Sequence, residues 1–376
     1  MWYKYNWFMG HKIILISDIH FGVKGNSETY LNIIENFFNK TLLSVINERN
    51  INDVRILGDL FDNRNALNVR TINSVVKIFK WYNENKPSVK FKILLGNHDQ
   101  YYHNRLDINS LEILREFNNV KIITTVEEEN IDGYKIISFP WLVQNTEPYV
   151  KFEEISTRDV KYDLCLGHFE INGFEATPGI TYDSGTDSGK FKNFLRVFSG
   201  HFHLRRSDGH ISYLGSPYPI TWSDYGDIKG IHIYDIETRE TEFIENKDSP
   251  QYIRITINDL IEKNLDKVKK INGNFVKLVV DKKYADQIII KAISKVESMS
   301  PKRLDVENQI IDDIDGENVD NTDISKLNNP LVFLLDYIKN LEINESNFDK
   351  TEFSSYVSNL YNSLIKDKDW NIHDSM

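Results

Sequence analysis

Seven side chains of metal-binding types follow short apolar segments of this chain. They occur in the motifs SDIH, GD, GNHD, GHFE and GHFH, and they are Asp18, His20, Asp59, Asn97, His168, His201 and His203. Carboxylate oxygens, an amide oxygen and imidazole nitrogens suit Mn, Fe or Zn, and the lack of cysteine thiolates in the set argues against a structural zinc site. In this order and on such loops, the seven residues predict a centre for two divalent metal ions.

The spacing within these motifs indicates how the side chains act together. In Asp18-x-His20 and in His201-x-His203, we expect the single intervening residue to place both side chains on the same side of an extended segment. Asp59 directly follows the run VRILG, where a loop carboxylate can bridge two cations. Asp59 is therefore the expected bridge of the centre.

The chemistry expected of such a centre is hydrolysis of phosphate esters. Two cations about 3.5–4 Å apart that share a carboxylate can hold a hydroxide between them and bind a phosphate for in-line attack. They lower the pKa of the attacking water and neutralise charge on the phosphoryl oxygens. His98 stands beside Asn97, and we expect it to stabilise or protonate the leaving oxygen rather than to bind metal.

Other polar residues near these motifs have more ordinary interpretations. Asp62, Asp99 and His103 are expected to support the ligands or to be structural. For Arg64, a salt bridge competes with a phosphate contact, and Trp141 is expected in the core rather than as a platform for bases. Weak candidates for contacts with backbone phosphates are Lys24, Arg205 and Arg206. The histidines without a motif are read as ordinary core or surface residues, namely His11, His210, His232 and His373.

The elements that must position these residues alternate along the chain from Lys12 to about Glu245. Nine short runs rich in Ile, Val, Leu and aromatic residues predict buried strands: KIILIS, VRILG, FKILLG, VKIITT, YKIISF, DLCLG, LRVFSG, ISYLG and GIHIYD. Tyr30 to Asn50 and Leu67 to Asn83 carry apolar residues at helical spacing, and the Asp208-Gly209 pair predicts a hairpin turn. An α/β domain with two sheets and helices outside them is the expected fold.

A second, smaller unit is predicted after Pro250. QYIRITI, a helical run from Asn258 to Lys270, NFVKLVV, a helix near Ala285 to Val296, and RLDVENQ indicate a small α+β domain of the order β-α-β-α-β. The acidic stretch DDIDGENVDNTD reads as a linker. The expected domains are residues 1–247, 248–310, a linker at 311–328, and C-terminal helices at 329–376.

The C-terminal part carries two amphipathic helices in this prediction. One runs from Leu331 to Leu341, and the other has a continuous apolar stripe from Phe353 to Ile365. An amphipathic face of this kind must be buried against something. Docking on the chain's own domain and binding of a partner protein are both open at this point.

Composition limits the class of protein. The net charge of −11 counts mildly against a protein that binds DNA by itself. Binding to DNA would then depend on local basic patches, on metal ions or on a partner subunit. No apolar run reaches the length that crosses a bilayer, and the N-terminus lacks the features of a secretory signal, with Met1 and Met9 both possible starts. The single cysteine, Cys165, is expected in the core, which fits a reducing cytoplasm.

The motifs SDIH, GD, GNHD, GH and GHFH stand in the order of the calcineurin-like metallophosphoesterases, and the chain resembles that family from about Lys12 to Glu245. The resemblance implies that Asp59 is shared by both metals. It implies Asp18, His20 and His203 for one metal. It implies Asn97, His168 and His201 for the other, and His98 as the catalytic histidine.

A finer resemblance is to the SbcD-type DNA repair nucleases, and closest to the recombination endonuclease subunits of T-even-like phages. SDIHFGVK, GDLFDNRNA, GHFEINGF, FSGHFH and YLGSP carry it. It implies manganese-dependent exonuclease and endonuclease activity on DNA in recombination, repair and replication, a homodimer, and host cytoplasm for a phage protein. It also implies a small capping domain, and C-terminal helices that bind an SMC-like, SbcC-type ATPase. Some relatives place a histidine at the position of Asp62, so a role for Asp62 in the exonuclease step does not transfer.

Two other functions stay open from the sequence. The same fold and metals could act on a phosphomonoester or a cyclic nucleotide, and activity on small esters above that on DNA would favour this. A scaffold that has lost catalysis is the third reading. The complete ligand set argues against it.

Overall fold

The structure is a computed structural model, and it describes residues 11–309, 351 and 353–358. By its backbone contacts the chain divides into residues 1–310 and residues 311–376. In the second unit, the described residues Thr351 and 353–358 are helical, and the side chains of Phe353 and Tyr356 are exposed. The predicted linker, the helix at Leu331 to Leu341 and the end of the apolar stripe lie outside the described residues.

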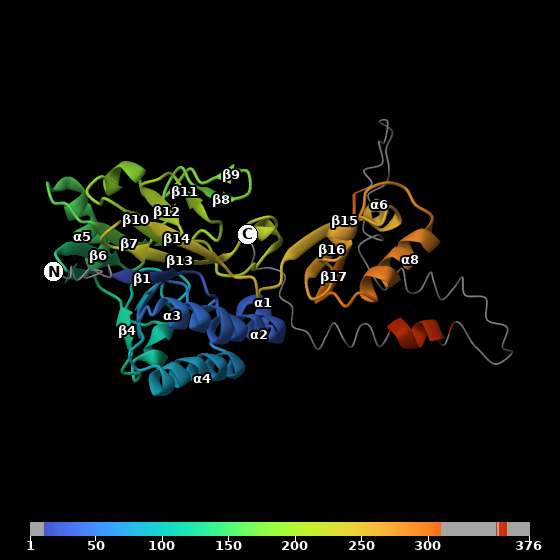
Figure 1. Ribbon diagram of the computed structural model, residues 1–376, viewed down its shortest axis with the longest axis horizontal. Coiled ribbons are helices and arrows are strands. Elements are labelled where there is room, and N and C mark those ends of the chain that lie inside the picture. The colour runs from blue at the N-terminus through green and yellow to red at the C-terminus, as the bar shows by residue number, and fades with distance from the viewer. Residues whose placement is uncertain (1–10, 310–350, 352, 359–376) are drawn as a thin grey trace, which may run out of the picture. The chain divides into compact units, whose positions relative to one another are not determined.

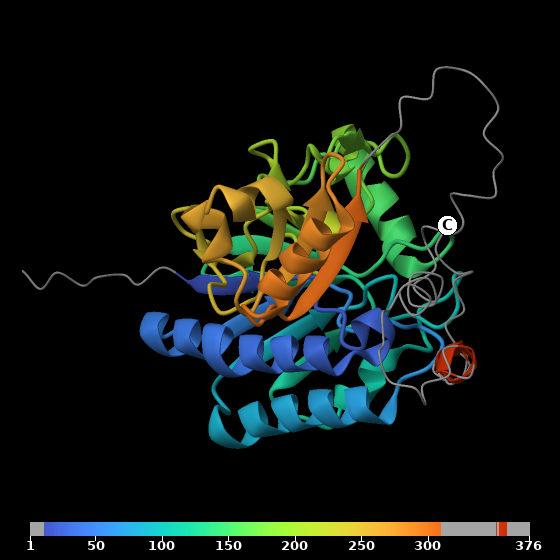
Figure 2. The same ribbon diagram turned by 90° about the vertical axis from the view of Figure 1, so that its right-hand side faces the viewer.

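The first sheet contains the strands that lead to the first four candidate ligands. Its order is β14 (Thr241–Glu245), β13 (Gly230–Asp235), β1 (Lys12–Ile16), β2 (Asp53–Ile56), β3 (Lys90–Leu94) and β4 (Val120–Ile123). Strands β1 to β4 run parallel, and β13 pairs antiparallel with both β1 and β14. Along one face lie α1 (Val23–Asn26), α2 (Glu28–Asn36), the π-helical η1 (Phe37–Leu42), α3 (Leu43–Arg49), α4 (Val69–Asn85) and η2 (Ser110–Leu114) (Figure 1, Figure 2).

The second sheet contains the strands that lead to the remaining three. Its order is β11 (Arg206–Ser207), β12 (Ile211–Tyr213), β10 (Val197–Gly200), β7 (Leu164–His168), β6 (Tyr134–Phe139) and β5 (Glu127–Ile131). The four central strands are parallel, and β5 and β11 are antiparallel edges. Its outer face is covered by α5 (Glu147–Thr157) and η3 (Ser188–Phe191), and a small hairpin of β8 (Glu175–Thr177) and β9 (Ile180–Thr181) follows β7.

Strand alternation explains why both sheets are buried on both faces. In β1, Ile14 and Ile16 pack with the helices, whereas Ile13 and Leu15 face the other sheet. Leu164 in β7 packs in the core between the sheets, and Cys165 next to it packs toward α5. Apolar side chains on both sides account for the nearly continuous apolar runs in the sequence. The two-sheet α/β sandwich flanked by helices is confirmed.

A buried ionic cluster fixes the two sheets against each other. Arg55 in β2 has 2% of its side chain exposed, and it binds Asp53 in the same strand at 2.9 Å. It also binds Glu129 in β5 of the other sheet at 2.8 Å, and Lys92 in β3 pairs with Glu129 as well. Burial alone would raise the pKa of Asp53, but the His11 ring and the Arg55 guanidinium hold it well below its usual value. Breaking such a buried pair on one side is strongly destabilising.

Residues 252–308, after Pro250, form a three-stranded sheet with its own core. The order is β15 (Tyr252–Thr256), β16 (Phe275–Val280) and β17 (Arg303–Asn308), all parallel. One face packs on α6 (Ile257–Ile261), α7 (Leu265–Val268) and α8 (Asp286–Glu297). The other face meets the sandwich, because Phe275 stacks on Tyr30 at 5.6 Å and Trp222, in η4 (Trp222–Asp224), donates to Asp305 at 3.2 Å.

Most predicted elements are present, and the differences have local causes. All nine predicted strands form, and Asp208-Gly209 closes the hairpin of β11 and β12. The helix expected from Asn258 to Lys270 is broken in two, because Lys263 adopts a left-handed φ of 53°. Sequence reasoning missed β5, whose EEENI segment is too polar to read as a strand. The Asp132-Gly133 turn that closes it, with φ of 52° and 93°, was the available signal.

No helix within the described residues is long and apolar enough to span a membrane.

Candidate metal centre

The loops of the centre leave the carboxyl ends of parallel strands in both sheets. β1, β2 and β3 of the first sheet lead into SDIH, GD and GNHD, and β7 and β10 of the second lead into GHFE and GHFH. Parallel strands present the same end at one edge, which is where α/β folds gather functional groups. Side chains from far apart in the sequence therefore meet at one place.

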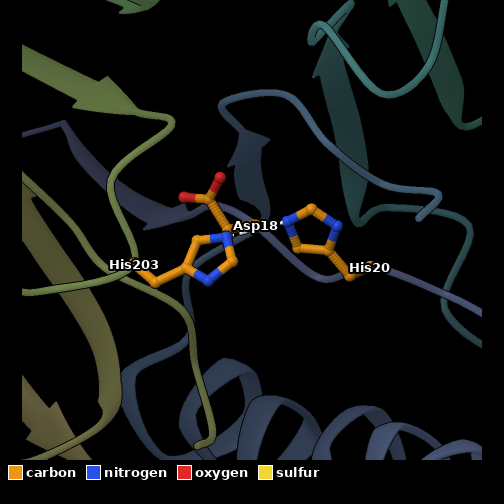
Figure 3. A group of neighbouring side chains, drawn as sticks. All are labelled: Asp18, His20 and His203. Atoms are coloured by element: carbon orange, nitrogen blue, oxygen red, sulfur yellow. Dashed lines mark hydrogen bonds between the residues drawn. The ribbon is translucent and has the colours of Figure 1, made fainter. Parts of the chain in front are cut away.

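One group consists of Asp18, His20 and His203. Each offers a ligand atom, and these atoms lie within 4.8 Å of one another. Nε2 of His20 is 3.0 Å from Nε2 of His203, although 183 residues separate them. Figure 3 shows the two imidazoles facing each other with Asp18 beside them, Asp18 and His20 on one loop and His203 on another.

A second group consists of Asp59, His168 and His201, and Asn97 joins it. Ligand atoms of the first three lie within 4.8 Å of one another. The amide oxygen of Asn97 is 2.9 Å from Nε2 of His168 and 3.1 Å from Nδ1 of His201. All four of these side chains thus converge on one point.

Asp59 lies between the two groups. Its Oδ2 is 3.3 Å from Nε2 of His168 and 3.8 Å from Nε2 of His20. Its Oδ1 accepts a hydrogen bond from the backbone N–H of His98 at 2.9 Å, which fixes the carboxylate. The structure therefore brings all seven sequence-predicted residues together, with the expected bridging carboxylate in the middle.

The backbone reaches this arrangement in a way that we did not expect. Asp18, His20 and Asp59 have φ values of 55°, 52° and 52°, and His201 has 94°. These are left-handed conformations, so the segments are not extended, and the alternation argument for Asp18-x-His20 and His201-x-His203 is wrong. A left-handed backbone conformation at a residue other than glycine costs of the order of 1–3 kcal/mol, and such strain is typical of functional sites. Sharp turns aim the side chains inward.

Two glycines leave the space that the turns need. A Cβ on Gly96 would collide with the carboxylate and the backbone nitrogen of Asp59. A Cβ on Gly200 would collide with the hydroxyl of Ser17 and come within 2.8 Å of Nδ1 of His168. The glycines of GNHD and GHFH are therefore required by close packing around the ligand loops.

The buried carboxylates of the centre favour positive charge on two of its histidines. Burial alone would lower the pKa of both His20 and His168, but nearby carboxylates raise each to about 9; Asp62 and Asp59 act on His20, and Asp59 and Asp18 on His168. Burial raises the pKa of Asp18. The positive charge and hydrogen bond of His168 hold the pKa of Asp59 well below its usual value against the effect of burial. Burial, together with repulsion from His20 and Lys229, lowers the pKa of His203.

The donor chemistry fits divalent cations. Nδ1 of His168 donates to the carbonyl of Leu57 at 2.7 Å, so its Nε2 carries a lone pair in the neutral ring. That lone pair faces the amide oxygen of Asn97, and two acceptors at 2.9 Å repel unless a proton or cation lies between them. Within the described part of the chain, Asp59 forms ion pairs with histidines alone, so no lysine or arginine neutralises it. Nitrogen and oxygen donors of this kind suit Mn, Fe or Zn.

Comparison with known proteins agrees with this geometry. Residues 11–205, more than half of the 376 residues, match the Calcineurin-like phosphoesterase family. The chain belongs to this family. Its members are phosphoester hydrolases that use divalent metal ions, as the donor set of the centre indicates.

Individual relatives of this phosphoesterase are similar over about half of the chain or more. Exonuclease subunit 1 of Enterobacteria phage T4 is 30% identical over 236 residues, which are 62% of this chain and 68% of the relative. Protein 078R of Invertebrate iridescent virus 3, which carries a phosphoesterase name, is 26% identical over 211 residues, 54% of this chain and 56% of the relative. A solved archaeal phosphodiesterase matches 62% of this chain and 99% of its own at 17% identity. Its TM-score of 0.31 is too low to bear on function.

Further groups of the phosphoesterase centre orient the candidate ligands. Nδ1 of His20 lies 3.3 Å from the carboxylate of Asp62, and Nε2 of His201 lies 3.7 Å from that of Glu170. Trp141 packs its ring 5.1 Å from that of His201. Partners of this kind fix the ring orientation of metal-binding histidines. The sequence pointed to Asp62 in this role but missed Glu170, which GHFE places two residues after His168.

The remaining candidates have structural partners. Asp99 is buried and accepts the backbone N–H groups of Phe61 and Gly96, which ties two motif loops together. Arg64 contacts a ring nitrogen of His103 at 2.7 Å rather than a carboxylate. Arg206 pairs with Glu175 at 2.5 Å, and Arg205 lies over the ring of Phe243. His11 pairs with Asp53, His210 with the Phe194 carbonyl, and His232 is buried.

Proposed function

We propose that this chain is a manganese-dependent DNA nuclease that hydrolyses phosphodiester bonds at the candidate metal centre. The observation that carries the proposal is Asp59 between two groups of donors, in a chain 30% identical to a phage exonuclease subunit. The proposed ligands are Asp18, His20, Asp59 and His203 for one ion. Asp59, Asn97, His168 and His201 bind the other.

His98 is the proposed catalytic residue. Its Nδ1 donates to the backbone carbonyl of Asp62 at 2.7 Å, which leaves Nε2 for the substrate. The side chain is partly exposed, and its ring centroid lies 5.0 Å from that of His20. Bound metal ions supply a nucleophilic hydroxide and charge neutralisation. The chain's own contribution is a fixed imidazole that can give a proton to, or hydrogen-bond, the leaving oxygen.

We further propose that the chain is a nuclease subunit of an SMC-like ATPase complex in recombination, repair and replication, within the host cytoplasm. The name of the T4 relative, a subunit, supports this. In this proposal the chain has a nuclease domain (1–247) and a capping domain (248–310), with C-terminal helices that bind the ATPase. The exposed Tyr356 of the helical segment 353–358 suits such docking.

Homodimer formation belongs to the same proposal. Exposed apolar side chains lie on two segments that contact each other through Arg64 and His103. They are Val69, Tyr101, Tyr102 and Ile108. Exposed apolar groups of this kind are typical of protein interfaces. An equilibrium sedimentation experiment that finds only monomer would contradict this part.

A cleavage assay tests the activity. Purified protein with Mn²⁺ should degrade linear DNA and cut single-stranded circular DNA, and His98→Ala should lower both rates by at least about 100-fold, the usual contribution of a general acid or base. Circles separate endonuclease from exonuclease action, because they have no ends. Intact DNA in the presence of Mn²⁺ and the ATPase partner would contradict the proposal. If the protein hydrolyses a small phosphomonoester or a cyclic nucleotide faster than DNA, that small ester is the substrate instead of DNA.

A further inference from the structure

Lys229, between η4 and β13, contacts the backbone of His203. Only 1% of the Lys229 side chain is exposed. Its ammonium donates to the carbonyl of His203 at 2.5 Å and lies 2.6 Å from Asp224 and 3.0 Å from Asp227. The ammonium thus hydrogen-bonds the His203 carbonyl, and the two carboxylates balance its charge as ion pairs.

The same groups hold the chain on either side of His203. Its carbonyl also accepts the backbone N–H of Ser216 at 3.1 Å. Asp227 accepts the backbone N–H of Arg205 at 3.3 Å. A Cβ on Gly215 would lie 2.7 Å from the His203 carbonyl, so the space around that oxygen is full. The backbone from His203 to Arg205 is therefore held by Lys229 and Asp227.

His203 needs this support more than the other candidate ligands do. His20, His168 and His201 each have their second ring nitrogen beside a carboxylate or a carbonyl. Among the hydrogen bonds of the described residues, the His203 ring makes one through Nε2, to His20, and none through Nδ1. Its position in the centre is thus set through its main chain rather than through its ring.

Stability alone does not account for this ion triad. Removing an ammonium and two carboxylates from water is costly, and apolar residues of similar size are often neutral or stabilising in their place. Asp224 fixes the position of the Lys229 ammonium. The second oxygen of the Asp224 carboxylate accepts the backbone N–H groups of Ile220 and Thr221 at 2.8 Å each, so the carboxylate itself is held in place. A donor at a defined point under the His203 carbonyl is what apolar packing could not supply.

We propose that Lys229 is a positioning residue for the metal ion bound by Asp18, His20 and His203. Through the His203 carbonyl it keeps Nε2 of His203 at the distance from His20 at which both can bind one ion. Removing it should weaken that ion and spare the one bound by Asn97, His168 and His201. The inference rests on the proposed two-metal function and deepens it.

The test compares Mn²⁺ binding by the full-length wild type and Lys229→Met, using titration and electron paramagnetic resonance. The wild type should bind two ions and show the signal of a spin-coupled pair. In Lys229→Met, one ion should bind about 10–100-fold more weakly, the usual loss when the support of a metal ligand is removed. The affinity for the ion bound by Asn97, His168 and His201 should change less than about threefold, and the spectrum should become that of an isolated ion. Lys229→Arg keeps a cationic donor and should restore the coupled signal.

A matched control separates positioning from general destabilisation. Arg55→Met also removes a buried cation from between two carboxylates, in the core between the sheets. It should lower the unfolding temperature without changing the ratio of the two affinities. If Lys229→Met does not fold, Asp224→Asn with Lys229→Met removes two charges together and leaves Asp227 with Arg206 at 3.5 Å.

The outcomes distinguish this inference from the function beneath it. Equal weakening of both ions, or no weakening of either, overturns the role of Lys229 while two ions in the wild type uphold the proposed centre. Fewer than two ions in the wild type overturn the proposed two-metal function, and the inference falls with it.

Discussion

The backbone carbonyl of Asp62 accepts a hydrogen bond from Nδ1 of His98 at 2.7 Å. Nδ1 therefore carries the proton, and Nε2 is available to a substrate. The carboxylate of the same residue lies 3.3 Å from Nδ1 of His20. Asp62 thus holds the proposed catalytic histidine through its main chain and a proposed metal ligand through its side chain.

Asp62→Ala should separate these two roles. The carbonyl stays, so His98 keeps its orientation, whereas His20 loses its carboxylate partner. We expect Mn²⁺ affinity to fall about 10–100-fold, with a rate at saturating Mn²⁺ close to that of the wild type. His98→Ala should show the reverse, a lost rate at every Mn²⁺ concentration with unchanged binding. A rate deficit in Asp62→Ala that saturating metal does not correct would contradict this division.

Glu170→Gln should affect the other ion. Glu170 lies 3.7 Å from Nε2 of His201 and accepts a hydrogen bond from the hydroxyl of Tyr182. Without the negative charge the His201 ring is a poorer ligand, so affinity for one ion should fall by about tenfold or more. Calorimetric titration measures this, with Glu175→Gln, on the neighbouring hairpin, as the control. Equal effects of the two variants would show that the charge on Glu170 has no specific role.

Gly96→Ala should abolish metal binding by displacing Asp59. The added Cβ would overlap the Asp59 carboxylate and backbone nitrogen, and both proposed ions share that carboxylate. Gly133→Ala, in the turn between β5 and β6, is the control, because its Cβ meets open space. Its φ of 93° is left-handed, so the control should lose about 1–2 kcal/mol of stability and keep both ions. Retained binding in Gly96→Ala would mean that Asp59 is not needed where the structure places it.

The stability of the fold should depend on His232 in mild acid. Burial, with help from Arg205 and Arg196, lowers the pKa of His232 to about 3, while the unfolded chain has a histidine pKa of about 6.5. Below pH 6.5 the unfolded state binds the extra proton, so stability falls as the pH falls from 6.5 toward 3. At pH 5 the loss is about 2 kcal/mol. Urea unfolding should show a flatter profile from pH 6.5 to 5 in His232→Leu, and an unchanged slope would refute this.

The sequence predicted the sandwich and proposed the residues of the candidate centre because both depend on short-range patterns. Runs such as KIILIS are apolar on both strand faces, and each candidate ligand follows such a run within a few residues. The conformation of the ligand loops was not predictable in the same way. Positive φ at Asp18 and His20 arises from contacts with a loop more than 35 residues away, since backbone N–H groups of both residues bond to carbonyls of Gly58 and Asp59.

Long-range supports were also beyond the sequence patterns. Lys229 is an unremarkable lysine in DIKGIHIY, and only the fold places it under His203, 26 residues earlier. Likewise, Glu170 and Trp141 belong to the site only because the fold brings them against the ring of His201. Metal-binding types at strand ends can be read from a sequence, whereas the residues that orient them depend on which loops meet.

The most direct test of this account is the number of Mn²⁺ ions bound by Asp59→Asn, measured by titration beside the wild type and His98→Ala. Asp59 lies between the two donor groups, so the wild type and His98→Ala should each bind two ions, and Asp59→Asn should lose tight binding of both. Loss of only one ion, or two ions bound with wild-type affinity in Asp59→Asn, would contradict the shared carboxylate on which the two-metal centre depends.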